Sequence, residues 1–208
     1  MATVKFPEQK VILCGEYGVG KSSLFRRFTT DTFTDKKSTL GLDHFTKTYA
    51  NERLQITLWD TGGMERIGSI TSSYYKFSKA AILVYALDCP DTFHLLSQHL
   101  LDIVMNAENA MIFLCGNKFD LKSKIRVSDH DMAIFHQQCH NLVSGIYKIS
   151  CRTGEGIEHM FEDIAVKVAE YNRSRMEIYA LEKNIGIDIS RSTLEETYDK
   201  SCPNCCNN

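Results

Sequence analysis

Residues 15–22 read Gly-Glu-Tyr-Gly-Val-Gly-Lys-Ser, a glycine-rich run that fits the eight-residue pattern of a phosphate-binding loop. In such a loop the glycines let backbone N–H groups turn inward around phosphate oxygens, and the following helix N-terminus adds its positive dipole. We expect Lys21 to reach the β- and γ-phosphates and the Ser22 hydroxyl to bind Mg²⁺. The alternative is a glycine-rich turn that matches the pattern by chance. The residues expected to line the phosphates are Gly15, Tyr17, Gly18, Val19, Gly20, Lys21, Ser22 and Ser23.

A second polar run, Asp60-Thr61-Gly62-Gly63, follows an apolar segment that ends at Trp59. An aspartate at a strand end facing a phosphate loop can hold Mg²⁺, usually through water, because Mg²⁺ keeps part of its hydration shell. We expect Asp60 to have this role and the backbone N–H of Gly63 to bind the γ-phosphate. Turns of this composition are common, so the prediction depends on the preceding phosphate loop.

Residues 117–120 read Asn-Lys-Phe-Asp and follow another apolar segment. A carboxylate can accept hydrogen bonds from both the N1–H and the N2 amino group of guanine, and adenine has no such donor pair. We therefore expect Asp120 to select guanine, Asn117 to brace the loop and the stem of Lys118 to cover the base. A kinase or ATPase, the competing class, would need a phosphoryl-acceptor site or an adenine pocket, and Asp120 argues against it.

The segments between these motifs alternate between short apolar runs and helical periodicity. This alternation predicts an α/β fold of the P-loop NTPase type, with a six-stranded, mainly parallel sheet and about five helices on both faces. Ligands of such sheets bind beyond the carboxyl ends of the strands, where all three motifs fall. The strands are expected at residues 10–14, 44–50, 54–59, 80–86, 111–115 and 142–149, and the helices at 21–30, 92–105, 128–139 and 156–171.

The chain has 208 residues, enough for one well-buried domain, which we place at residues 8–172. Residues 173–208 are interpreted as a flexible tail with a helical start. A formal net charge of -2 argues against a protein that coats nucleic acid. No apolar stretch reaches the roughly 20 residues that span a bilayer, and no secretory signal is visible before residue 10, so a cytosolic location is expected. The cysteines before residue 152 are interpreted as reduced core residues.

In order and context these motifs resemble those of Ras-superfamily small GTPases, and among them the Rab family, over residues 8–171. The resemblance implies that the chain binds GTP, GDP and Mg²⁺, and that Thr39 completes the magnesium shell and senses the γ-phosphate. Ser150, Cys151 and Arg152 stand where the family has Ser-Ala-Lys, which implies contact with guanine, with the Cys151 N–H on its carbonyl oxygen. Further Rab-like segments are residues 38–43, 54–60, 74–76 and 79–82.

Two residues depart from the family pattern beside the γ-phosphate. Met64 stands where most members have the glutamine that orients the attacking water, and a thioether cannot hold that water. Tyr17 stands where the family has a small residue, and its phenol crowds the space for an arginine finger. The switch I loop is also one residue shorter than is usual in the family and lacks the aromatic residue often found just before Thr39. We predict slow intrinsic GTP hydrolysis by the catalytic set Lys21, Thr39, Gly63 and Met64; alternatively, a partner supplies the missing glutamine.

Three cysteines crowd the last seven residues, as Cys202, Cys205 and Cys206. Cys202 and Cys205 form a Cys-x-x-Cys, but no strand or helix frames it as a redox pair, and structural zinc would need four ligands. The pair Cys205 and Cys206 resembles the double-geranylgeranylation signal of Rab proteins, although Asn207 and Asn208 fit a CaaX box poorly. Because the tail has no polybasic patch, stable anchoring requires both lipids. An autophagy-linked atypical Rab branch has a comparable ending and an altered catalytic position.

The resemblance implies a monomeric GTP/GDP switch for vesicle trafficking, peripheral on the cytosolic face of internal membranes. Switch I, residues 36–45, and switch II, residues 62–75, would bind effectors, an exchange factor and a GTPase-activating protein. The tail would bind the prenylation and escort machinery, and its lipids the membrane surface. The alternative is a module that loads GTP, hardly hydrolyses it and binds effectors under the control of nucleotide exchange. No nucleic-acid partner is expected.

Overall fold

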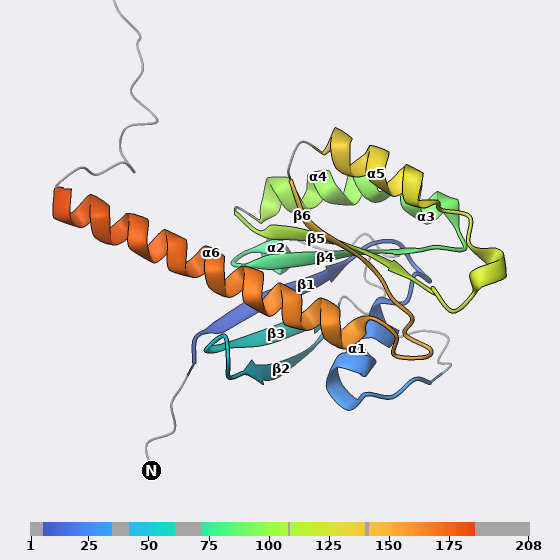
Figure 1. Cartoon of the computed structure of the whole chain (residues 1–208), viewed down its shortest axis with the longest axis horizontal. Coiled ribbons are helices and arrows are strands. Elements are labelled where there is room, and N and C mark those ends of the chain that lie inside the picture. Colours follow the sequence, from blue (N-terminus) through green and yellow to red (C-terminus); the bar gives the residue numbers. More distant parts are fainter. Residues whose placement is uncertain (1–5, 35–41, 61–71, 108, 140–141, 186–208) are drawn as a thin grey trace, which may run out of the picture. The chain divides into compact units, whose positions relative to one another are not determined.

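The computed structural model describes residues 6–34, 42–60, 72–107, 109–139 and 142–185. Their centre is a six-stranded sheet with the strand order β2-β3-β1-β4-β5-β6 (Figure 1). Strand β2 is antiparallel to β3, and the other neighbours are parallel. The predicted mixed but mainly parallel sheet is therefore confirmed. The strands are β1 (Glu8–Cys14), β2 (Asp43–Tyr49), β3 (Leu54–Asp60), β4 (Ala80–Ala86), β5 (Met111–Asn117) and β6 (Val143–Lys148).

Helices cover both faces of this sheet (Figure 1). On one face α1 and the first part of α6 pack on the sheet, and on the other α3, α4 and α5 do so. Contacts within the chain define one compact unit from Met1 to Ala169 and a second from Glu170 to Asn208. The helices are α1 (Lys21–Thr30), α2 (Ser72–Tyr75), α3 (Pro90–His94), α4 (Leu96–Asn106), α5 (Asp129–Gln138) and α6 (Ile157–Ile185), with a 3₁₀ turn, η2, at Lys122–Lys124.

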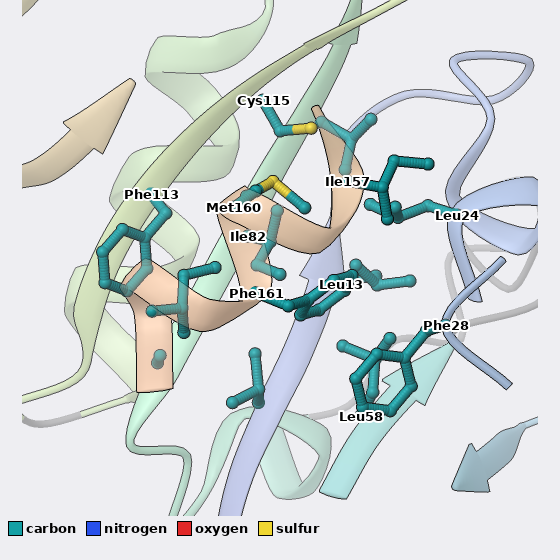
Figure 2. Packing of buried hydrophobic residues seen from close by; sticks show 14 of the residues in the cluster. Leu13, Leu24, Phe28, Leu58, Ile82, Phe113, Cys115, Ile157, Met160 and Phe161 are labelled. Atoms are coloured by element: carbon teal, nitrogen blue, oxygen red, sulfur yellow. The ribbon is translucent and has the colours of Figure 1, made fainter. Parts of the chain in front are cut away.

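The central strands are buried on both faces, as their continuous apolar sequences require. Every residue of β4 is buried, and its neighbours β1 and β5 are nearly so. On the α1 and α6 face, Phe28 and Phe161 lie with ring centroids 4.5 Å apart and close over Leu58 and Leu13 (Figure 2). This packing fixes α1, and with it the loop that precedes α1, against the end of β1.

Two helix predictions differ from the structure. The helix expected at residues 92–105 is two helices, because the chain turns at Leu95, which ends α3 and begins α4. The first of them begins at Pro90, which suits a first helical position since it needs no backbone N–H. The last helix was expected to end near Tyr171 and continues to Ile185. Residues 172–185 include Ala, Leu, Met, Glu, Lys and Arg, which favour helix, so the helical start expected for the tail is present.

The turn between α2 and β4 lies at the amino end of the central strands and is tightly held. The Lys10 ammonium donates to the carbonyls of Tyr74 and Lys76, and the Ser78 N–H donates to the Tyr75 carbonyl at 3.2 Å. In this turn Phe77 has a left-handed φ of 63° and 89% of its surface exposed. A bulky side chain is strained in that backbone conformation, so neither packing nor geometry explains the phenylalanine. Among the described residues, no helix is both long and apolar enough to cross a membrane.

Candidate guanine-nucleotide site

The glycine-rich loop joins the carboxyl end of β1 to the first residue of α1. Gly15, Gly18 and Gly20 have φ values of 127°, 77° and 104°, in the region that favours glycine. A Cβ on Gly15 would lie 2.1 Å from the carbonyl oxygen of Val84, and one on Gly20 would lie 2.3 Å from Nδ2 of Asn117. The loop is therefore pressed against β4 and β5, and side chains have no room at these two positions.

Lys21 is a buried cation that folds back over this loop. Its side chain is only 6% exposed, and its Nζ donates to the carbonyls of Gly15 at 2.8 Å and Glu16 at 2.9 Å. Nearby, burial raises the pKa of the Cys14 thiol to about 12, although the Lys21 charge acts in the opposite direction. The loop thus holds one positive charge at its centre and leaves its cysteine neighbour neutral at physiological pH.

Asn117, the last residue of β5, links two loops that are far apart in sequence. It is 3% exposed, its Nδ2 donates to the Val19 carbonyl at 2.8 Å, and its Oδ1 accepts from the Cys151 N–H at 3.1 Å. The phosphate loop and residues 150–152 are therefore joined through one buried amide, which is the bracing geometry expected for Asn117. The Cys151 N–H, which the sequence assigned to guanine, makes this internal contact.

Asp120 is half-buried and held by the same segment. The Ser150 hydroxyl donates to its Oδ1 at 2.7 Å and also accepts from the Thr153 N–H at 3.1 Å. Lys118 has a left-handed φ of 68° and its ammonium pairs with Asp88 at 3.1 Å. The Asp120 carboxylate and residues 150–152 thus come together beyond the ends of β5 and β6, where Arg152 is exposed and Cys151 is buried.

Burial also shapes the chemistry of Cys151. It raises the pKa of that thiol to about 12, while Arg27 and Asn117 act weakly in the opposite direction. A thiol with this pKa is neutral at physiological pH and a poor nucleophile. The Cys151 side chain is therefore a small packing group whose neutral thiol lies 4.0 Å from the Gly20 carbonyl oxygen, and the stronger polar contacts of Cys151 are made by its backbone N–H and carbonyl.

Sequence reasoning missed Arg27, which lies one and a half turns into α1. Its Nε donates to the Cys151 carbonyl at 2.7 Å and its Nη2 to the Arg152 carbonyl at 2.6 Å. Its Nη1 donates to the Asp31 carbonyl at 2.8 Å, directly after α1. These three acceptors are backbone carbonyls, which no residue type signals. A fourth, longer contact of 3.3 Å joins Nη1 to the Asp31 carboxylate.

A second missed contact ties the phosphate loop to α4. Nε2 of His99 lies 3.0 Å from Oε1 of Glu16, and both side chains are largely shielded from solvent. Tyr17, the next residue, is 45% exposed at the rim of the loop. The loop is thus fixed on one side by α4 and on the other by Asn117, with the phenol at its open edge.

The residues expected to hold magnesium are described only in part. Asp60 ends β3 and is 1% exposed, and β3 pairs with β1, which leads into the phosphate loop. Ser22 is the second residue of α1, half-buried. Within the described part of the chain no three His, Cys, Asp or Glu side chains group as a metal site. A carboxylate and a hydroxyl are hard oxygen donors, which suit Mg²⁺ when phosphate and water complete its shell.

Several predicted residues lie outside the described ranges, at positions 35–41, 61–71 and 186–208. They are Thr39, Gly63, Met64, Cys205 and Cys206.

Comparison of the sequence with known proteins identifies its family. The family model described as the Ras family matches residues 10–170. The chain is 36% identical over 166 residues to Ras-related protein RABC1 of Arabidopsis thaliana, covering 77% of each chain. It is 35% identical over 165 residues to Ras-related protein Rab-30 of Homo sapiens, covering 76% of this chain and 79% of the relative. To Ras-related protein Rab-18-B of Danio rerio it is 34% identical over 166 residues, covering 77% and 79%.

Proposed function

This chain belongs to the Ras family of small GTPases, and from that premise we propose that it is a Rab-like switch that binds GTP and GDP and acts in membrane trafficking. The observation that carries the proposal is the buried Asn117 bridge, which joins the phosphate loop to residues 150–152 beside Asp120. These loops come from three separate parts of the sequence. Their meeting at one edge of the sheet makes room for a ligand with both a base and phosphates.

Base selection is the role of the Asp120 carboxylate. Held by Ser150 at 2.7 Å, it is oriented to accept from the two donors on the guanine edge. Lys118 covers the base with its stem, and the loop at Ser150, Cys151 and Arg152 closes the other side. Because Cys151 N–H already donates to Asn117 at 3.1 Å, a guanine carbonyl would share that donor.

Phosphate binding uses the backbone of residues 15–20 and the Lys21 ammonium. The Lys21 ammonium already lies within the loop, where it donates to the Gly15 and Glu16 carbonyls. Bound phosphate would replace these carbonyls as the acceptor of the ammonium. Ser22, Thr39 and Asp60 would hold Mg²⁺, which neutralises phosphate charge when bound. Ser23 lines the α1 end of the loop, and the Gly63 N–H would donate to the γ-phosphate as the switches close.

Hydrolysis is proposed to be slow in the absence of a partner. Met64 has no hydrogen-bonding group able to orient water, and Tyr17, 45% exposed at the rim, occupies space that an arginine finger would need. Single-turnover GTP hydrolysis by wild type, Met64→Gln and Tyr17→Gly tests this. Faster hydrolysis by either variant supports it, whereas measurable wild-type hydrolysis that neither variant exceeds contradicts it. The alternative function, a GTP-loaded binding module, is supported if all three proteins are inert.

Membrane attachment is proposed through Cys205 and Cys206, in a tail at residues 173–208 that follows a GTPase domain at residues 8–172. The switches would bind effectors, an exchange factor and an activating protein on the cytosolic face of internal membranes, and the tail the escort machinery. Membrane extraction of wild type beside a Cys205→Ser and Cys206→Ser double variant tests the anchor. Equal partitioning of the two proteins would contradict it.

The nucleotide itself is tested by competition against fluorescent GDP. We expect unlabelled GDP to compete at least roughly 10³-fold better than ADP, because a site built to pair with polar groups rejects ligands that lack them. Asp120→Asn replaces one acceptor by a donor, so it should weaken GDP and strengthen xanthosine diphosphate, which has a carbonyl at position 2. Glu162→Gln on the exposed side of α6 is the matched control and should bind like wild type. Equal competition by ADP would overturn the base assignment.

A further inference from the structure

We propose that Arg27 is a positioning residue that sets how long guanine nucleotide stays bound, because it couples the guanine loop to the root of switch I. The inference rests on the proposed function and adds a regulatory contact within the same site. The Arg27 guanidinium makes three hydrogen bonds to backbone carbonyls and a longer one, at 3.3 Å, to the Asp31 carboxylate. The three carbonyl contacts join α1 to residues 151–152 and to residue 31, which are separated by most of the chain.

The guanidinium is shielded and fully engaged. Its side chain is 13% exposed, and the three contacts to Cys151, Arg152 and Asp31 have lengths of 2.7, 2.6 and 2.8 Å. A guanidinium presents its N–H groups in one rigid plane, so the positions of the three carbonyls are fixed relative to one another. Lysine has a single ammonium on a flexible stem and cannot reproduce that geometry.

The carbonyl contacts bear directly on the guanine loop. The Cys151 and Arg152 carbonyls are held on the α1 side, and in a trans peptide the N–H points away from the carbonyl, so the N–H groups of Arg152 and Thr153 are directed away from α1. The Thr153 N–H donates to the Ser150 hydroxyl, and the Cys151 N–H, one peptide earlier, donates to Asn117. In this structure the loop has a second support, the Ser150 contact to Asp120 at 2.7 Å. Arg27 holds one side of the loop and Ser150 the other.

The third contact connects the loop to the switch. Asp31 ends α1 in a left-handed conformation, φ 51°, and its N–H donates to the Arg27 carbonyl at 3.1 Å while its own carbonyl accepts from the guanidinium. The switch I segment begins a few residues later. A partner that pulls this segment away from α1 would remove one of three acceptors, turn the guanidinium and loosen the guanine loop.

Dissociation of fluorescent GDP tests the coupling, with Arg27→Lys and Arg27→Ala beside wild type. Both variants should release GDP of the order of tenfold to a hundredfold faster, since bonds to a charged donor are lost. A second nucleotide, 2-aminopurine riboside diphosphate, lacks the 6-oxo group that the loop would bind. For this nucleotide the dissociation rates of the variants should differ from that of wild type by less than about threefold. The contact to the 6-oxo group, which the Arg27 substitutions weaken, is already absent from its complex with wild type.

Two controls separate positioning from general damage. Arg26→Ala removes the neighbouring arginine, which bonds to Thr34 and not to the guanine loop. Asp31→Gly keeps the left-handed backbone and its carbonyl, and removes only the exposed carboxylate that pairs with Arg27 at 3.3 Å. Both should release GDP within about twofold of wild type. Wild-type rates in the Arg27 variants, equal acceleration for both nucleotides, or equal acceleration by Arg26→Ala would overturn the proposal.

A readout without nucleotide keeps this test apart from the proposed function. Alkylation of Cys151, followed by mass spectrometry, should accelerate in Arg27→Lys because the loop opens more often, while alkylation of Cys115 inside β5 should not change. Unchanged Cys151 alkylation would overturn the positioning role. If the wild-type chain does not bind GDP, the proposed function fails, and the alkylation rates still decide what Arg27 holds.

Discussion

The loops at the carboxyl ends of the strands and those at the amino ends, called here the carboxyl edge and the amino edge of the sheet, are held in place differently. At the carboxyl edge, side chains of Asn117 and Arg27 donate to backbone carbonyls of remote segments, and Lys21 donates to carbonyls of its own loop. At the amino edge, backbone bonds that continue the sheet do most of this work, such as Lys79 N–H to the Lys10 carbonyl at 2.8 Å. Side chains of Lys10 and Lys167 also brace that edge, since Lys10 donates to the Tyr74 and Lys76 carbonyls and Lys167 to the Ser144 carbonyl.

The difference shows where geometry has been fixed before any ligand arrives. Loops at a binding edge are more mobile by default, and ordering them during binding would reduce affinity. Cross-bracing removes much of that cost at the carboxyl edge. The amino edge needs no such order, and it tolerates a strained, exposed Phe77. Substitutions should therefore be far more disruptive at the first edge than at the second.

The largest effect is expected for Gly15→Ala. Its new Cβ would lie 2.1 Å from the Val84 carbonyl oxygen, at a φ of 127° that alanine avoids. We expect a loss of roughly 4 kcal/mol in the free energy of unfolding, or no folded protein, from strain plus overpacking. Gly18→Ala is the matched comparison, since no atom lies within 4 Å of its added Cβ. Urea denaturation measures both, and equal losses would contradict the close approach of the loop to β4.

Asn117→Ala should cause the second largest loss of unfolding free energy. It leaves the Val19 carbonyl and the Cys151 N–H without their partner in a buried site, at a cost of about 3 kcal/mol in unfolding free energy. GDP affinity should fall with it, because the two loops separate. Denaturation and GDP binding are measured on the same preparation. A variant with wild-type stability and affinity would show that the loops are held by other contacts.

The sheet was predictable from the sequence for a simple reason. Strands such as Ala80–Ala86 are buried on both faces and are apolar throughout, so each one carries its own signal. The motifs of the candidate site could be proposed in the same way, because a phosphate loop and a guanine-selecting carboxylate require particular residue types, and their ligand contacts stay predictions. The break at Leu95 carried no such signal, since the sequence there remains compatible with one continuous helix.

Arg27 could not have been found by that reasoning. Its acceptors are carbonyls of Cys151, Arg152 and Asp31, which any residue type supplies, and two of them lie more than a hundred positions away. The contact depends on how the segment after β6 returns to α1, which is a property of the folded chain. The contact between Glu16 and His99 was missed for the same reason.

Alkaline pH should lower the free energy of unfolding through two buried thiols of the carboxyl edge, by less than the Gly15 and Asn117 substitutions do. Burial raises the pKa of Cys14 and of Cys151 to about 12, from an ordinary value of 9.0. The pKa of each thiol is higher in the folded than in the unfolded chain, so burying the neutral thiol contributes to the free energy of unfolding. This contribution is complete below pH 9 and is lost as pH rises toward 12. At pH 10 the loss is about 1 kcal/mol per thiol. Denaturation at pH 7 and pH 10 measures it, and a Cys14→Ala, Cys151→Ala double variant should lose less between the two.

The smallest effect, with the opposite sign, is expected at the amino edge. Phe77→Gly relieves the left-handed strain at φ 63° and removes no buried surface, so unfolding free energy should rise by about 0.5–1 kcal/mol. Lys76→Gly, at the exposed neighbouring position, serves as the control and should destabilise slightly. A stability loss in Phe77→Gly would mean that the exposed ring makes contacts that hold this turn.

Hydrogen exchange of the full chain, with and without GDP and Mg²⁺, tests the contrast between the two edges most directly. We predict slower amide exchange at residues 15–22, 117–120 and 150–153 when GDP is present, and unchanged exchange at residues 74–79. That result would place the guanine nucleotide across the cross-braced loops of the carboxyl edge. No slowing at residues 117–120 and 150–153, or equal slowing at residues 74–79, would contradict the account.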